Sequence, residues 1–178
     1  MFTSEQVTKI RAIQSGAITR MCNLLSHFSI VNHEGYDSPY FETGVFVFAL
    51  TGIVFRDKLE ELKEVIDSPV VLYGGEDDEG IRRRLSLYAK AADGDIMPCG
   101  FWSMHPINTL FPSPILRIFA MFGDFLVCPE SPAEYTCYEW PLLKSSDMAT
   151  FSRVFTTRVL EEVGNYIAAI AGVMNEEE

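Results

Sequence analysis

An apolar stripe near the C-terminus constrains the fold of this chain more than any other feature. Hydrophobic side chains recur there every three or four residues: Met148, Phe151, Phe155, Val159, Val163, Tyr166, Ile170 and Val173. This spacing is the period of an α-helix with one buried face, and it is kept for about seven turns. Ser145, Ser146 or Asp147 is suited to cap the first turn. The sequence therefore predicts a long C-terminal helix that must pack against another apolar surface.

A similar stripe opens the chain. Thr3 and Gln6 have the spacing of a capping box, in which each side chain bonds the backbone of the other. The apolar positions that follow have helical spacing: Val7, Ile10, Ile13 or Ala17, Met21, Leu24 or Leu25, and Phe28. We therefore predict an N-terminal helix.

Residues 44–66 predict a second helix, although part of this stretch is ambiguous. The run Val45-Phe46-Val47-Phe48 fits a buried strand as well as a helix. Positions 45, 48, 52, 55, 59, 62 and 66 form one helical stripe, and we favour a helix that begins near residue 44. Residues 32–43 before it are rich in turn formers and predict a loop. Pro69 predicts the end near residue 66, because the residue before a proline avoids helical geometry.

Residues 70–140 read as strands and tight turns. Leu85 and Leu87 alternate with polar neighbours, and Asp93-Gly94 is a hairpin-turn signal. Gly123-Asp124 similarly predicts a turn between two strands, at 115–122 and 125–128. The order of elements predicts a single α+β domain over residues 1–178. Its antiparallel sheet of about five to six strands is packed by the N-terminal helix, the helix ending near residue 66 and the long C-terminal helix.

The charge balance limits the partners of this chain. It holds 25 acidic and 14 basic residues, a formal charge of −11, although 48% of its residues are hydrophobic. Direct nucleic-acid binding is not expected, since Lys and Arg must neutralise phosphates. No membrane span is expected either, because the longest apolar run is shorter than the roughly 20 residues that a helix needs. With four scattered cysteines and no leader pattern, we expect a cytoplasmic protein.

Motifs that carry catalysis or bind cofactors do not stand out. The glycine-containing stretch at 73–80 lacks the spacing of a phosphate-binding loop, and its acidic residues would repel phosphate. Cys99 and His105 resemble a nucleophile and its base only by sequence proximity, and no third residue that would orient them is evident. The cysteines and histidines also lack the paired spacing of a zinc site. We therefore expect no enzyme, cofactor or metal, although a site assembled from dispersed residues stays open.

The remaining signals favour contact with another protein. Glu76, Asp77, Asp78 and Glu79 are expected at a solvated hairpin tip, with Arg82, Arg83 and Arg84 pairing locally with them. Phe101 and Trp102 belong to a set of aromatic side chains in the predicted strands, some of which must lie on the outer face of the sheet because strand residues alternate. Several of them exposed together would form the apolar centre of a protein-binding surface, and we assign Phe101 and Trp102, with the four acidic residues, to partner binding. The chain is thus predicted to be an acidic interaction module of the inhibitor, immunity, chaperone or adaptor type. It would dock on a basic or apolar protein surface. A structural subunit of a larger particle, such as a viral one, is the alternative, and a homodimer is compatible with either function.

Overall fold

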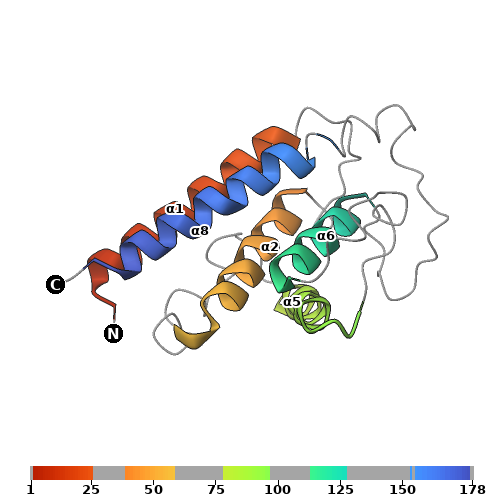
Figure 1. Ribbon diagram of the computed structural model, residues 1–178, viewed down its shortest axis with the longest axis horizontal. Coiled ribbons are helices and arrows are strands. Elements are labelled where there is room, and N and C mark those ends of the chain that lie inside the picture. The colour runs from red at the N-terminus through yellow and green to blue at the C-terminus, as the bar shows by residue number, and fades with distance from the viewer. Residues whose placement is uncertain are drawn as a thin grey trace.

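The computed structural model describes residues 2–25, 39–58, 78–96, 113–127, 153 and 155–176. Every regular element in these segments is a helix (Figure 1): α1 (Ser4–Leu25), α2 (Pro39–Val54), the short 3₁₀ helix η2 (Arg56–Lys58), α5 (Asp78–Asp93), α6 (Pro114–Val127), the π-helical turn η5 (Phe155–Val159) and α8 (Leu160–Met174). These residues contain no strand. The predicted α+β class, with a sheet of five to six strands, is therefore wrong for the described part of the chain.

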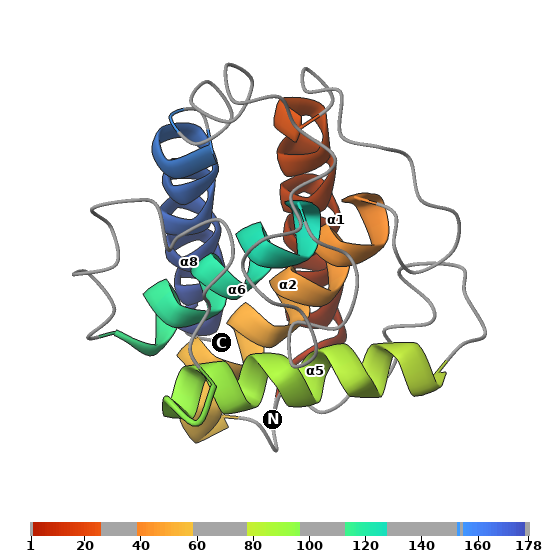
Figure 2. The same ribbon diagram turned by 90° about the vertical axis from the view of Figure 1, so that its right-hand side faces the viewer.

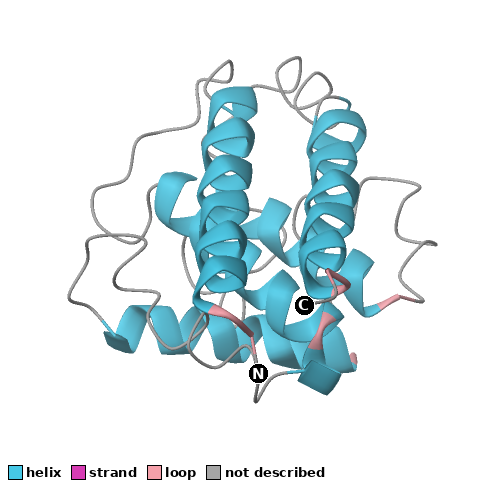
Figure 3. Ribbon diagram, turned by 90° about the vertical axis from the view of Figure 1, so that its left-hand side faces the viewer, coloured by secondary structure: helices cyan, strands magenta, loops and turns pink. Residues whose placement is uncertain are grey.

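Helices α1 and α8 form an antiparallel pair along one side of the molecule (Figures 1 and 3). The first and last helices thus meet, and both chain ends lie at the same end of the pair. Their predicted inner faces are confirmed at the described positions, whereas Phe28, Met148 and Phe151 of the predicted stripes lie outside the described residues. The buried positions are Ile10, Ala17, Met21 and Leu25 on α1, and Val163, Tyr166, Ile170 and Val173 on α8.

The predicted capping box at the start of α1 is also confirmed. The Thr3 backbone N–H donates to Gln6 Oε1 at 2.9 Å, and the Gln6 backbone N–H donates to Thr3 Oγ1 at 3.2 Å. Gln6 Nε2 in addition donates to the carbonyl of Val173 at 3.2 Å. The cap therefore both begins α1 and joins it to the last turn of α8.

Helix α2 is enclosed by other helices. It packs against α1, α5 and α6, and every residue from 42 to 51 is buried. A helix buried on all sides needs apolar residues all round, which explains why its sequence also fitted a strand. The helical prediction for residues 44–54 is confirmed, but the bounds are wrong. The helix begins at Pro39, within the predicted loop, and ends at Val54, while residues 59–66 lie outside the described segments.

Helix α5 occupies the segment that was predicted to be a strand near Leu85. Its inner face holds Ile81, Arg84, Tyr88 and Ala91, which follow a helical period that outweighs the local alternation. Asp93-Gly94 is the end of this helix. Gly94 has a φ of +81°, its N–H donates to Ala91 O at 3.1 Å, and the Asp95 N–H donates to Lys90 O at 2.8 Å. This is a Schellman cap, which uses the same glycine chemistry as a hairpin turn.

Helix α6 replaces the second predicted hairpin. Ser113 precedes it and its carbonyl accepts the Arg117 N–H at 3.1 Å, while Pro114 takes the first helical position, where a missing N–H costs little. Gly123 and Asp124 lie inside the helix and are buried. The predicted turn there is wrong, because surrounding helices cover this segment.

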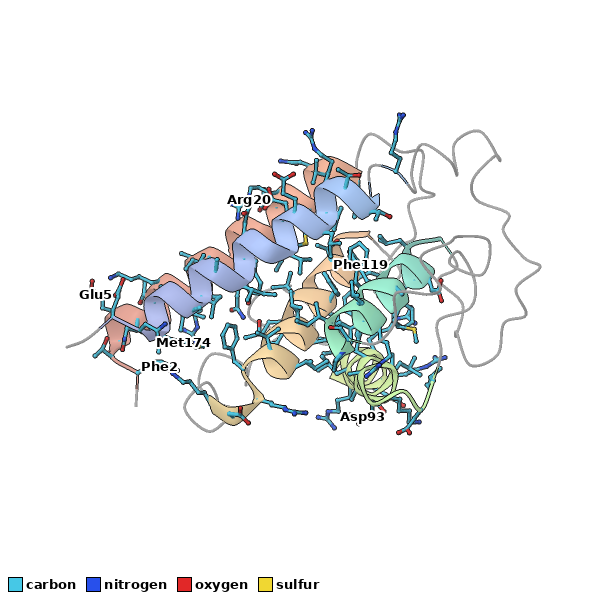
Figure 4. The ribbon with its side chains drawn as sticks, viewed as in Figure 1. Phe2, Glu5, Arg20, Asp93, Phe119 and Met174 are labelled. Carbon is cyan, nitrogen blue, oxygen red and sulfur yellow. The ribbon has the colours of Figure 1, made fainter. Side chains whose placement is uncertain are left out.

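Aromatic side chains fill the space between α2, α5 and α6. Figure 2 shows α5 running across the other two helices. The Phe46 and Phe122 rings stack at 4.3 Å with an interplanar angle of 3°, and Tyr88 meets Phe125 edge-on at 5.3 Å. Phe119 also lies in this cluster, 6.5 Å from Phe46 (Figure 4). Phe119, Phe122 and Phe125, which were predicted to lie in strands, therefore belong to a core between helices.

None of the helices in the described segments combines the length and apolar character needed to cross a membrane.

Candidate functional site

Two of the six predicted partner-binding residues lie in the described segments. Asp78 is the first residue of α5, and Glu79 follows it and is exposed. The predicted hairpin tip is therefore wrong at these two positions, which belong to the first turn of a helix. Acidic residues are favourable there because they face the positive end of the helix dipole. Glu76, Asp77, Phe101 and Trp102 lie outside the described residues.

The three consecutive arginines of α5 have different surroundings. Arg82 and Arg83 are exposed, whereas Arg84 is buried. Arg84 Nη2 lies 2.8 Å from Glu42 Oε1 of α2, and the guanidinium carbon lies 4.3 Å from the centre of the Phe125 ring. Through these two contacts Arg84 joins α5 to α2 and α6.

The Glu42–Arg84 pair is almost fully removed from water. Its side chains are 0% and 6% exposed. Taking two charges out of water is costly, and the cost is offset only when attraction and further contacts are well formed. The stacking of Arg84 on Phe125 is one such contact. The ion pair therefore helps to fix the position of α5 on α2 and α6. Its burial leaves these two side chains inaccessible to a substrate.

A second contact fixes the far end of α5. Arg117 of α6 donates from Nε and Nη2 to the carbonyl of Ala92, at 3.0 and 2.6 Å. This carbonyl is in the last turn of α5, where no backbone N–H of the same helix remains to satisfy it. Together, Arg84 and Arg117 hold both halves of α5.

Another buried polar cluster joins α1, α2 and α8. Thr51 Oγ1 donates to the Val47 carbonyl at 2.8 Å, accepts from Gln14 Nε2 at 3.5 Å and is hydrogen-bonded to the Tyr166 hydroxyl. One donor and two acceptor sites of the threonine hydroxyl are thus used. Burial raises the pKa of Tyr166 to about 12, although its bonds with Thr51 and Gln14 act in the opposite direction. Tyr166 is therefore neutral near pH 7 and acts as a structural link.

Cys22 is the one cysteine in the described segments, and it is a free thiol on α1. Burial raises its pKa, and a hydrogen bond with Thr43 of α2 partly opposes this. A raised pKa leaves little nucleophilic thiolate at neutral pH. Within residues that the structure describes, no three His, Cys, Asp or Glu side chains are grouped so that they could hold a metal ion.

Charged contacts on the α1–α8 pair are exposed. Arg20 Nε lies 2.9 Å from Glu162 Oε2, and Lys9 Nζ lies 2.9 Å from Glu176 Oε2 and 3.2 Å from Glu5 Oε1. The bonds to Glu176 and then Glu5 raise the pKa of Lys9. In Figure 4, Arg20 and Glu5 lie on the outer side of the pair. Such exposed pairs contribute little to stability.

The outer face of α8 carries mostly short, uncharged side chains. We define this face by its exposed residues Glu161, Gly164, Asn165, Ala168, Ala169 and Gly172. Arg158 of η5 precedes it, and Glu176, which pairs with Lys9 of α1, follows the helix. Gly164 and Gly172 have open space around them, since an added Cβ would meet no atom within 4 Å. Packing among the described residues therefore does not require glycine at either position.

The negative charge of the chain is unevenly distributed along its sequence. The described segments hold twelve Lys and Arg against eleven Asp and Glu. The other segments hold the remaining two basic and fourteen acidic residues, six of the latter within residues 59–77. The described segments are thus close to electrically balanced, and the acidic excess lies in the remaining residues of the sequence.

Comparisons with known proteins identify no relative. No family model matches the chain, and no curated protein or solved structure is significantly similar to it. The function must therefore be argued from the chain itself.

Proposed function

We propose that this chain is a non-enzymatic protein-interaction module that docks on a basic patch of another protein. The uneven distribution of charge is the observation that carries the proposal. Fourteen acidic residues against two basic ones lie outside the described segments, and Glu79 continues the acidic run Glu76-Asp77-Asp78 as an exposed side chain of α5. Concentrated charge of one sign attracts an oppositely charged surface and raises the rate of encounter.

The contacts of the buried polar groups support a binding role over a catalytic one. Glu42 and Arg84 are turned towards each other, and Gln14, Thr51 and Tyr166 form hydrogen bonds among themselves. Each cluster joins helices together. The proposed setting is the cytoplasm, where reducing conditions would keep Cys22 a thiol.

The test is charge reversal of the acidic run. Glu76, Asp77, Asp78 and Glu79 are all changed to Lys, and a tagged chain is used to capture and identify a partner from an extract of its natural source. Association with the purified partner is then measured by stopped-flow. We expect slower association for the variant, and a rate that falls for the natural chain as salt is raised.

A matched control separates this run from net charge in general. Changing Asp57, Asp93, Asp95 and Glu161 to Lys alters the formal charge by the same amount at exposed positions of the helical body. We expect this variant to keep most of the association rate. Equal slowing by both variants, or a rate that is unaffected by salt and by either variant, would contradict docking through the acidic run.

A further inference from the structure

We propose that Ser86 of α5 is the phosphate acceptor for a serine protein kinase that selects basic residues on the N-terminal side of its target. The site is the stretch Arg82-Arg83-Arg84-Leu85-Ser86-Leu87. Kinases of this class recognise their targets by charge pattern, with acidic pockets for arginines two and three residues before the serine and an apolar pocket for the residue after it. Here these positions are Arg84, Arg83 and Leu87. The inference does not rest on the function proposed above.

The hydroxyl to be modified is accessible in the folded chain. Ser86 is exposed, on the side of α5 that faces away from the buried residues Arg84 and Tyr88. Figure 2 shows α5 at the edge of the molecule, with α2 and α6 on its inner side. Arg83 and Lys90 are exposed on the same outer side, and within the described segments their side chains form no ion pair.

The surroundings of this serine suit a phosphate. Residues three and four apart are neighbours on a helix, so that Arg82 and Arg83 on one side of the serine and Lys90 on the other can all reach it. A phosphoserine would accept charge-assisted hydrogen bonds from these cations. The acidic residues Glu79 and Asp93 are each two helical turns away, about 10 Å along the axis, where salt screens most of their repulsion.

The same stretch shows how the fold limits the modification. Arg84 and Leu87, which the kinase has to contact, are buried against the neighbouring helices. The kinase must therefore meet α5 when part of it has left α2 and α6, and local openings of this kind have their own free energy. The ion pair between Arg84 and Glu42 opposes the opening. The rate of modification should therefore rise when this ion pair is weakened.

The chemical step is transfer of the γ-phosphoryl group of ATP. The Oγ atom of Ser86 forms a bond to the γ-phosphorus, and the bond from this phosphorus to the oxygen that bridges to the β-phosphate breaks. ADP leaves with the electron pair of that bond, and the hydroxyl proton passes to the catalytic aspartate of the kinase. The product adds about 1.5 to 2 negative charges to the outer side of α5.

The experiment is an initial-rate assay of the full chain with ATP and the catalytic subunit of cyclic-AMP-dependent protein kinase. Mass spectrometry of the digested product locates the phosphate. We expect it at Ser86, and Ser86→Ala should abolish it. Ser15 of α1 is an internal control, because it is also exposed but has Ala12 and Ile13 where arginines are required. An unlabelled Ser86, or equal labelling of Ser15, overturns the proposal.

Three substitutions test how the site is recognised, with circular dichroism to check that the helices are retained. Arg83→Gln should lower the initial rate about tenfold or more, the loss expected for one charge-assisted contact. Lys90→Gln removes a cation from the same side of α5, but after the serine, and should keep most of the rate. Glu42→Gln should raise the rate. Equal losses in R83Q and K90Q overturn recognition of the arginines, and an E42Q rate at or below the natural one overturns the role of the ion pair.

Discussion

The α1–α8 pair and the α2–α5–α6 cluster place their charged groups in opposite ways. In the pair, apolar side chains meet inside, while Arg20 and Glu162 join the helices from the outside. In the cluster, Glu42 and Arg84 form their ion pair in the interior, among aromatic rings. The first arrangement follows the usual division of apolar inside and polar outside. The second places a matched pair of charges among the contacts that hold α5, beside the bond of Arg117 to the Ala92 carbonyl.

This difference implies different sensitivities to mutation. An exposed charge that loses its partner is stabilised by water, whereas a buried one is not. The helices of the pair can therefore exchange surface charges at low cost. In the cluster, the buried charges of Glu42 and Arg84 instead have few tolerated alternatives.

The largest effect is expected at Glu42. Glu42→Ala leaves the Arg84 guanidinium buried without this carboxylate, and should lower the free energy of unfolding by about 3–5 kcal/mol. Glu161→Ala, at an exposed glutamate of α8, should change it by less than about 0.5 kcal/mol. Urea denaturation of both variants measures the difference. A similar loss in the two would show that the cluster is no more sensitive than the pair.

The buried hydroxyl of Tyr166 predicts a dependence on alkaline pH. Its pKa is raised to about 12 in the folded chain from a model value of 10.0. The unfolded chain therefore loses this proton first, so the stability that Tyr166 contributes is complete below about pH 10. It falls between pH 10 and 12, by about 2–3 kcal/mol in total. Tyr166→Phe should lack this component, and parallel pH profiles for the two proteins would contradict it.

Thr51 and Thr19 provide a matched comparison of a buried and an exposed hydroxyl. Each donates to the carbonyl four residues earlier, at 2.8 and 3.0 Å, but only Thr51 also bonds Tyr166 and Gln14. Thr51→Val should cost about 1–3 kcal/mol, because its partners stay buried without a bond. Thr19→Val should be close to neutral. Thermal unfolding of both variants tests this, and equal melting temperatures would count against the buried junction.

The smallest effect is expected at Arg20. Arg20→Ala removes the ion pair with Glu162, whose side chains are 53% and 20% exposed. We expect a loss below about 1 kcal/mol, which becomes smaller as salt is raised. Urea denaturation at low and high salt measures it. A loss as large as that of Glu42→Ala would remove the distinction between the two regions.

The sequence was sufficient to predict the two helices α1 and α8, but neither their pairing with each other nor the cluster. The apolar stripe that contains Ile10 and Met21, and the one that contains Val163 and Tyr166, both have the spacing of a helix and fit no strand. A capping box also marks the start of α1. In α5, the alternation of Leu85 and Leu87 concealed the helical set Ile81, Arg84 and Tyr88, because an arginine was not counted as a core residue. The glycines also mislead, since Gly94 caps a helix and Gly123 lies inside one.

The candidate sites were still harder to derive from sequence. Gln14 lies within the apolar stripe of α1, between Ile10 and Ala17, and that position is a signal of a buried polar group. Glu42 gave no such signal, because it was assigned to a loop. Its pairing with Arg84 depends on how α2 and α5 meet in space, and residues far apart in one sequence carry no record of that contact.

Backbone chemical shifts test the central claim most directly, namely that the middle of the chain is a helical cluster around α2. We expect ¹³Cα shifts of helical sign throughout residues 78–93 and 114–127, with no break at Gly123 and Asp124. Shifts of strand sign in these segments, interrupted at residues 123–124, would contradict the account and restore the sheet that the sequence first indicated.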